Sequence, residues 1–379
     1  MKAIIGGVTT PKGFKANGMS AGIKKSGKPD LALIACEKPA TAAAVFTKNS
    51  VKAAPVLVCQ KHIHRGTSRA VVVNSGNANC FNGPFGMIYA QQTADIFGKF
   101  LNIPAQDVLV ASTGIIGRPL PFENIKNNAR ALVDGLSSDG GSKVAEAIMT
   151  TDLAMKEIAV TVDIGGKTVT IGGCAKGSGM IQPNMATMLG FMTTDANITA
   201  KMLKLALQQS VEDSFNSITV DGCMSTNDMV SVMASALAGN PVIKKEDKNF
   251  KIFVQALRHV CMDLAMKIVL DGEGATKLIE VRVQGGKSKK QAKDAALAVA
   301  NSNLVKTAAY GDNPNWGRVA AAVGSLGIKT INEQTLKMSF NISEKHILID
   351  LDLHHGKESA VVYTCDLTEE YVRINGKYN

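Results

Sequence analysis

One stretch of the sequence, AKGSGMIQPNMATMLGFMTTD at 175–195, constrains the chain more than any other. A glycine-rich turn leads through Pro183 and Asn184 into an apolar run, and Thr187 stands where loop becomes strand. A threonine behind small residues at such a junction can present its hydroxyl as a nucleophile. Because no histidine lies nearby in the sequence, the base would have to be the threonine's own α-amino group. That chemistry requires cleavage of the Ala186–Thr187 bond.

The alternative role for Thr187 is structural. A β-branched residue suits a strand, and the methionines around it are typical fillers of an irregular apolar core. On spacing alone, the structural role is the favoured interpretation.

Composition places the chain among globular proteins of reducing compartments. Its 379 residues can bury a large core in one domain or two. No apolar run approaches the length of a membrane span, and the first residues are too weakly apolar for a signal peptide. Seven cysteines without CxxC spacing favour free thiols over disulfides. We therefore expect a cytoplasmic protein with no membrane partner.

The positive charge is concentrated in the first half of the chain. Residues 1–186 carry 20 Lys+Arg against 11 Asp+Glu, and residues 187–379 carry 22 against 21. The basic residues are spread rather than clustered and aromatic residues are scarce, which disfavours nucleic-acid binding. A field that attracts small anionic substrates fits better, with a merely solvated basic surface as the alternative.

The glycines of AKGSGM match neither a P-loop nor a dinucleotide fingerprint, so nucleotide binding at this loop is not predicted.

Apolar periodicity predicts helices and strands that interleave irregularly. Helical spacing is found at 85–100, 122–136, 142–150, 199–215, 247–272 and 288–303. Strand patterns are found at 31–47 (broken by Pro39), 70–80, 107–117, 277–285 and in the last fifty residues, with a hairpin about Gly165-Gly166. Ser142 is the expected cap of one helix. The segment 217–239 is interpreted as strand, turn and helix, with Asn227 or Asp228 as the cap. This order favours a mixed α/β or α+β sandwich over a Rossmann sheet.

Several motifs, in the same order, make the chain similar to the ornithine acetyltransferase (glutamate N-acetyltransferase, ArgJ) family of arginine biosynthesis. Beside the Thr187 segment these are GGVTTPKGFKANGMSAGIK, VVVNSGNANC, ASTGIIG, MTTDLAMK, ITVDGCMSTND, DGEGATK, NPNWGR and EYVRING. The resemblance implies a layered α/β/β/α sandwich in a self-cleaving N-terminal-nucleophile enzyme. It also implies an α chain of residues 1–186 and a β chain of residues 187–379, assembled as an α2β2 heterotetramer.

The resemblance also implies roles for single residues. Thr187 would be the nucleophile, released by cleavage after Ala186, and Thr113 and Gly114 would form the oxyanion hole. The residues implied to bind substrate are Thr150 (with Thr151 as the alternative), Lys176, Thr187, Glu273 and Asn375. The chain departs from the family pattern at Cys223 and Met224, where polar residues are usual. It also ends at Asn379, without the family's terminal Ser or Thr.

The implied reaction moves an acetyl group from N2-acetylornithine to glutamate through acetyl-Thr187, giving ornithine and N-acetylglutamate. In the bifunctional branch of the family acetyl-CoA is also a donor. No cofactor is expected, and no metal, because His346, His354 and His355 lack the further ligands of a typical site. Two alternatives are an N-terminal-nucleophile amidase or aminopeptidase of related fold and, more distantly, a basic nucleic-acid-binding protein.

Overall fold

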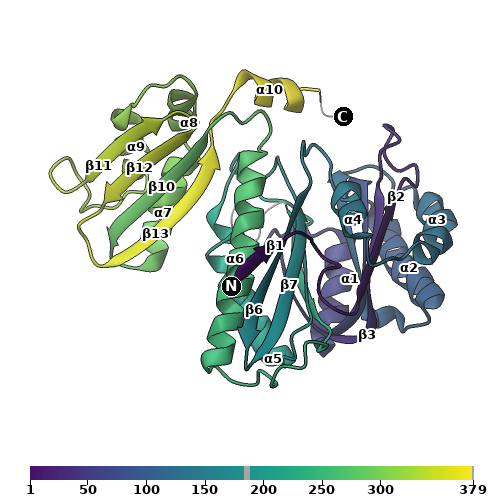
Figure 1. Cartoon of the computed structure of the whole chain (residues 1–379). Helices are drawn as coiled ribbons and strands as arrows, with labels where there is room; N and C mark the ends of the chain where they lie inside the picture. The colour runs from purple at the N-terminus through teal and green to yellow at the C-terminus, as the bar shows by residue number, and fades with distance from the viewer. Residues whose placement is uncertain (183–187, 378–379) are drawn as a thin grey trace. The chain divides into compact units, whose positions relative to one another are not determined.

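The computed structural model describes residues 1–182 and 188–377, which form two compact units (Figure 1). The described residues of unit 1 are 1–177, 188–216 and 224–265, and those of unit 2 are 178–182, 217–223 and 266–377. Each unit contains a sheet with helices packed against it, so the expected mixed α/β architecture with layered sheets is confirmed. The predicted α and β chains concern cleavage of the backbone, and that division stays a prediction.

Among its described residues, the sheet of unit 1 has nine strands in the order β1-β6-β7-β8-β9-β3-β4-β5, with β2 paired to β3. Its strands are β1 (Lys2–Ile4), β2 (Phe14–Met19), β3 (Leu31–Phe46), β4 (Thr67–Asn77), β5 (Val108–Ile115), β6 (Lys156–Ile164), β7 (Lys167–Lys176), β8 (Leu189–Thr194) and β9 (Met229–Ala234). The long β3 pairs with β2 and β4 through its first half and with β9 through its second half. Its register with β4 shifts between Ala35 and Ala40. This interval contains Pro39, where we expected the strand pattern to be broken.

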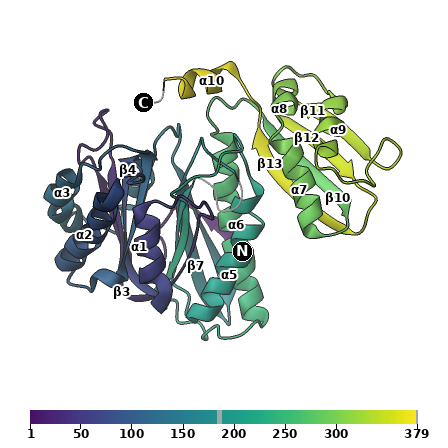
Figure 2. The same ribbon diagram turned by 180° about the vertical axis from the view of Figure 1, so that it is seen from behind.

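Helices pack against the strands of unit 1 (Figures 1 and 2). They are α1 (Ala54–His62), α2 (Gly83–Leu101), α3 (Phe122–Asp134), α4 (Gly141–Ala147), α5 (Ala200–Glu212) and α6 (Lys248–Leu270), with 3-10 turns at Ile63–Arg65, Ala105–Asp107 and Phe215–Ser217. Residues 266–270 of α6 and Ser217 are assigned to unit 2. Side chains alternate along β3, so Leu31 and Leu33 join one core with α2 and α3, whereas Ile34 joins another with α4. No helix of the described residues is long and apolar enough to cross a membrane.

Unit 2 is built on a second sheet with the order β11-β12-β10-β13. Its elements are β10 (Leu278–Gly286), α7 (Lys289–Ala300), α8 (Asn303–Tyr310), α9 (Trp316–Gly324), β11 (Lys337–Ser343), β12 (His346–Asp352), β13 (Glu358–Cys365) and α10 (Glu369–Asn375). The alanine-rich face of α7 packs on β10 and β13, because small side chains let helix and sheet approach closely. The strands predicted in the last fifty residues are confirmed, although β12 runs parallel to β10.

Three local predictions are wrong. The strand predicted at the start of 217–239 does not form, because a 3-10 turn occupies Phe215–Ser217 and Ile218 makes only an isolated bridge. Residues 229–234 form the strand β9 rather than a helix, so Asn227 and Asp228 cap nothing. The strand lies between β8 and β3 and is buried throughout, so it lacks the alternation that would have marked it. The helix predicted at 142–150 begins earlier, with Gly140 as its N-cap and no capping side chain, so Ser142 is not its cap.

Candidate active site

The end of β5 has no room for a side chain at Gly114. Thr113 and Gly114 lie beside Gly76 and Asn77 of β4, where the register shifts. Gly114 has φ +131°, and a Cβ there would lie 2.3 Å from the carbonyl carbon of Gly76 and 2.5 Å from the nitrogen of Asn77. Only glycine fits this position, because both neighbours are backbone atoms. Because β4 lies so close, it restricts the backbone conformation of Gly114.

Lys176, the last residue of β7, brings the predicted site residues of unit 1 together. Its Nζ donates to Thr150 Oγ1 at 2.7 Å and to Thr113 Oγ1 at 3.4 Å. The lysine side chain is only 4% exposed. Of the two threonines considered at 150 and 151, Thr150 therefore makes this contact. Because Lys176 donates to the oxygen of Thr113, the hydroxyl hydrogen of Thr113 is directed elsewhere.

A buried carboxylate, Asp152, fixes the position of Lys176. Its Oδ1 accepts from Lys156 Nζ at 2.8 Å and from the Gly177 N–H at 2.7 Å, and its Oδ2 lies 3.9 Å from Lys176 Nζ. Burial alone would raise the pKa of the Asp152 carboxyl, but the Lys176 and Lys156 ammonium groups hold that pKa well below its usual range. The carboxylate is therefore ionised throughout the physiological pH range.

The cleavage segment itself is only partly described. Ala186 and Thr187 lie outside the described residues. The next residue, Met188, donates its backbone N–H to Asp228 Oδ1 at 3.0 Å. Asp228 is 1% exposed, and burial raises the pKa of its carboxyl well above the usual range.

A neighbouring side chain, Asn227, connects this segment to β5, the strand that contains Thr113 and Gly114. Its amide donates to Ser112 O at 2.8 Å and to Ala78 O. Ser112 immediately precedes Thr113. Asp228 therefore contacts Met188, and the adjacent Asn227 contacts the strand that carries the predicted oxyanion hole.

The remaining predicted residues meet in unit 2. Asn375 Nδ2 donates to Glu273 Oε2 at 2.7 Å, and Glu273 is 8% exposed. Gly179 passes close to the same carboxylate, because a Cβ there would lie 2.3 Å from Glu273 Oε2. The structure thus groups the predicted site residues that it describes into one cluster in each unit.

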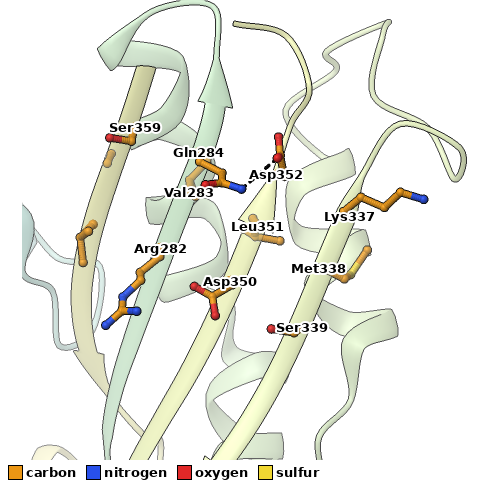
Figure 3. Close-up of a pocket in the computed structure, with 12 residues that line it drawn as sticks. Arg282, Val283, Gln284, Lys337, Met338, Ser339, Asp350, Leu351, Asp352 and Ser359 are labelled. Atoms are coloured by element: carbon orange, nitrogen blue, oxygen red, sulfur yellow. Dashed lines mark hydrogen bonds between the residues drawn. The ribbon is translucent and has the colours of Figure 1, made fainter. Parts of the chain in front are cut away.

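A separate hollow lies on the sheet of unit 2 (Figure 3). It is lined by Arg282 and Gln284 of β10 and by Asp350 and Asp352 of β12, with Gln284 Nε2 donating to Asp352 Oδ2 at 2.9 Å. In the part of the chain that the structure describes, no sequence-predicted site residue lines this hollow. The described residues also contain no group of three or more potential metal ligands.

The sequence did not predict the hydrogen bonds and ion pairs made in the site by four residues, Asp152, Lys156, Asn227 and Asp228. The signal for the first pair was the four-residue spacing in DLAMK, but that spacing indicates a contact only on a helix, and this segment is not helical. The other two were interpreted as helix caps. Their long-range contacts follow from tertiary structure and leave no local signal.

Comparison with known proteins gives a match along almost the whole chain. The model of the ArgJ family matches residues 15–379. The chain is similar to the arginine biosynthesis bifunctional protein ArgJ of Symbiobacterium thermophilum, with 47% identity over 100% of both chains. It is 45% identical to the protein of the same name from Gloeobacter violaceus, over 99% of this chain and 98% of that one.

Solved structures were also found. An ArgJ crystal structure from Bacillus halodurans is 43% identical and covers 47% of this chain and 94% of its own, with a TM-score of 0.46. The ornithine acetyltransferase of Mycobacterium tuberculosis, complexed with ornithine, is 40% identical and covers 47% of this chain and 95% of its own, with a TM-score of 0.43.

Proposed function

The chain belongs to the ArgJ family, and on that premise we propose that it moves the acetyl group of N2-acetylornithine to glutamate through an acetyl ester on Thr187. It is thus an acyltransferase of arginine biosynthesis. The observation that carries the proposal is the contact of Lys176 with Thr150 and Thr113, directly beside the Gly114 turn. This contact supports the proposal because a buried cation touches the residue that directly precedes Gly114.

The first half of the reaction is attack by the Thr187 hydroxyl on the acetyl carbonyl. Cleavage after Ala186 frees the α-amino group of Thr187, which takes the hydroxyl proton as the new C–O bond forms. An α-amino pKa of about 7.7–8.0 suits a base near neutral pH. The Thr113 hydroxyl and the Gly114 N–H donate to the developing oxyanion. The C–N bond then breaks, the leaving nitrogen takes the proton, and ornithine departs.

The second half reverses these roles. The α-amino group of glutamate attacks the acetyl ester, and the same two donors stabilise the tetrahedral intermediate. Collapse releases N-acetylglutamate and returns a proton to the threonine oxygen. Lys176 and Thr150 bind the α-carboxylate common to both substrates, and Glu273 with Asn375 provides further substrate contacts.

Further features belong to the same proposal. Self-cleavage yields residues 1–186 and 187–379, which remain together as an α2β2 heterotetramer in the cytoplasm. Acetyl-CoA serves as a second acetyl donor, in keeping with the word bifunctional in the names of the similar proteins. No cofactor takes part in the steps above.

Replacement of the nucleophile tests the proposal. Thr187→Ala should leave the purified chain uncleaved and lower glutamate-dependent acetyl transfer on the order of 10³-fold or more, because no hydroxyl remains to carry the acetyl group. Thr187→Ser should cleave and retain activity, and Thr168→Ala, at an exposed position of β7, should behave as the wild type. Denaturing electrophoresis with intact-mass analysis detects the fragments. Acetate release that does not depend on glutamate would favour the amidase instead.

A further inference from the structure

Lys24 lies beside the paired strands β4 and β5 at the level of Gly114. Its side chain lies over Gly76, because a Cβ on that glycine would be 2.9 Å from Lys24 Cγ. Gly76 in turn is the cross-strand partner of Gly114. The predicted functional residues do not include Lys24, and the acyl-transfer steps described above make no use of it.

The backbone around Lys24 is held firmly. The Asp30 carboxylate accepts from the Lys24 N–H at 2.8 Å and from the N–H groups of Ala21 and Ile23, both at 2.6 Å. Lys24 Nζ donates to the carbonyl oxygen of Pro29 at 2.6 Å. An ammonium group has three hydrogens to donate, so two remain for other acceptors.

The charge of the Lys24 ammonium is only partly offset by the nearby carboxylates. No carboxylate in residues 1–182 or 188–377 forms an ion pair with it, because the oxygens of Asp30 face backbone N–H groups. Burial lowers the pKa of Lys24 to about 8, and the charge of Lys176 lowers it further while Asp30 and Asp152 oppose the change. A half-buried cation in this state gains from any anion that reaches it.

The two substrates of the proposed reaction differ in the charge that such a cation would meet. Glutamate has a second carboxylate at the end of its side chain, whereas the side chain of ornithine ends in an ammonium. Lys176 is already bound to Thr150, Thr113 and Asp152 and serves the carboxylate that both substrates share. A second cation with two unused ammonium hydrogens, near the same backbone, would attract the side-chain carboxylate of glutamate but not the side-chain ammonium of ornithine.

We propose that Lys24 is the specificity-determining residue that binds the side-chain carboxylate of the acceptor glutamate. This inference rests on the proposed function. It makes the site selective for a dicarboxylate in the second half of the reaction.

The test compares Lys24→Met with Lys25→Met, a change at the exposed neighbouring lysine. Lys24→Met should raise the KM for glutamate about tenfold, the loss expected for one charge-assisted hydrogen bond that is partly exposed to solvent. Ornithine release from N-acetylornithine in a single turnover should change less than about twofold. Lys25→Met should change neither quantity. Equal effects of Lys24→Met on both halves, or no effect on glutamate, would overturn the inference.

A binding measurement tests the role of Lys24 without acetyl transfer, so a failure of this inference can be told apart from a failure of the proposed function. Glutarate, a dicarboxylate without an amino group, should bind the wild type more tightly than butyrate in calorimetry, and Lys24→Met should abolish the preference. The preference should decline as pH rises through about 8, where Lys24 loses its proton, and should persist to higher pH in Lys24→Arg. A wild type that binds glutarate in this way but transfers no acetyl group would refute the proposed function alone. Equal binding of both acids would refute the role of Lys24 alone.

Discussion

Asp152→Asn is expected to lower the free energy of unfolding by about 3–5 kcal/mol, the usual effect of removing one member of a buried ion pair. The substitution leaves the Lys156 ammonium without the carboxylate that lies 2.8 Å away, and it weakens the hold on Lys176. It also puts an amide N–H₂ in place of one carboxylate oxygen, where the backbone N–H of either Thr150 or Gly177 now donates. Denaturant unfolding monitored by circular dichroism measures the loss.

Asp134→Asn provides the matched control. Asp134 also pairs with a basic residue, since Arg130 Nε lies 2.9 Å from its carboxylate, but both side chains are more than half exposed. Its loss should change the free energy of unfolding by less than about 1 kcal/mol. Equal effects of the two substitutions would contradict the structural importance given to Asp152.

The same carboxylate makes stability depend on acid pH. The folded-state pKa of Asp152 lies below its value in the unfolded chain, so its contribution is fully present above the unfolded value of about 3.9. The contribution is lost as pH falls from there toward the folded-state pKa. Asp152→Asn should therefore unfold with less dependence on pH in this range than the wild type.

Gly114→Ala is expected to lower kcat by about 10²–10³-fold, the effect of losing one oxyanion donor. A methyl group at this position would collide with the backbone of Gly76 and Asn77, so the turn must move and carry the Gly114 N–H away from the developing charge. KM for both substrates should change far less, because Lys176 and Thr150 stay in place. Steady-state kinetics with N-acetylornithine and glutamate measures both quantities.

Gly117→Ala separates the loss of a donor from general backbone strain. Gly117 lies three residues along the same loop with φ +79°, and a Cβ there would meet no atom within 4 Å. It shares the left-handed backbone cost of about 1–2 kcal/mol but not the collision. Similar kcat values for the two variants would contradict an oxyanion role for the Gly114 turn.

The fold was predictable where one face of an element is buried and the other is exposed. Such helices as α2 and α6, and the hairpin about Gly165-Gly166, were found at nearly their observed limits. The strand β9 was not found, because both of its faces are buried, which removes the alternation of buried and exposed residues, and its Met and Ala residues also suit a helix. The two-unit organisation left no linker or change of composition in the sequence.

The candidate site was predictable only through its resemblance to a family. The resemblance identified Thr113, Thr150 and Lys176 as site residues from three motifs that are far apart in the sequence. The structure brings these three side chains together. The resemblance said nothing of Asp152 or Lys24, whose contacts depend on how distant strands and loops meet. Local pattern cannot specify the contact of Asp152 with Lys176 or that of Lys24 with Gly76, because these partners are separated by tens of residues along the chain.

The most direct test of the central claim is to trap the acetyl-enzyme. Purified protein mixed with N-acetylornithine in the absence of glutamate should, by intact-mass analysis, gain one acetyl group on the fragment 187–379, with peptide mapping to Thr187. Glutamate added afterwards should remove that group and yield an equal amount of N-acetylglutamate. Formation of N-acetylglutamate while both fragments stay unmodified, or an acetyl group that maps elsewhere, would contradict transfer through Thr187.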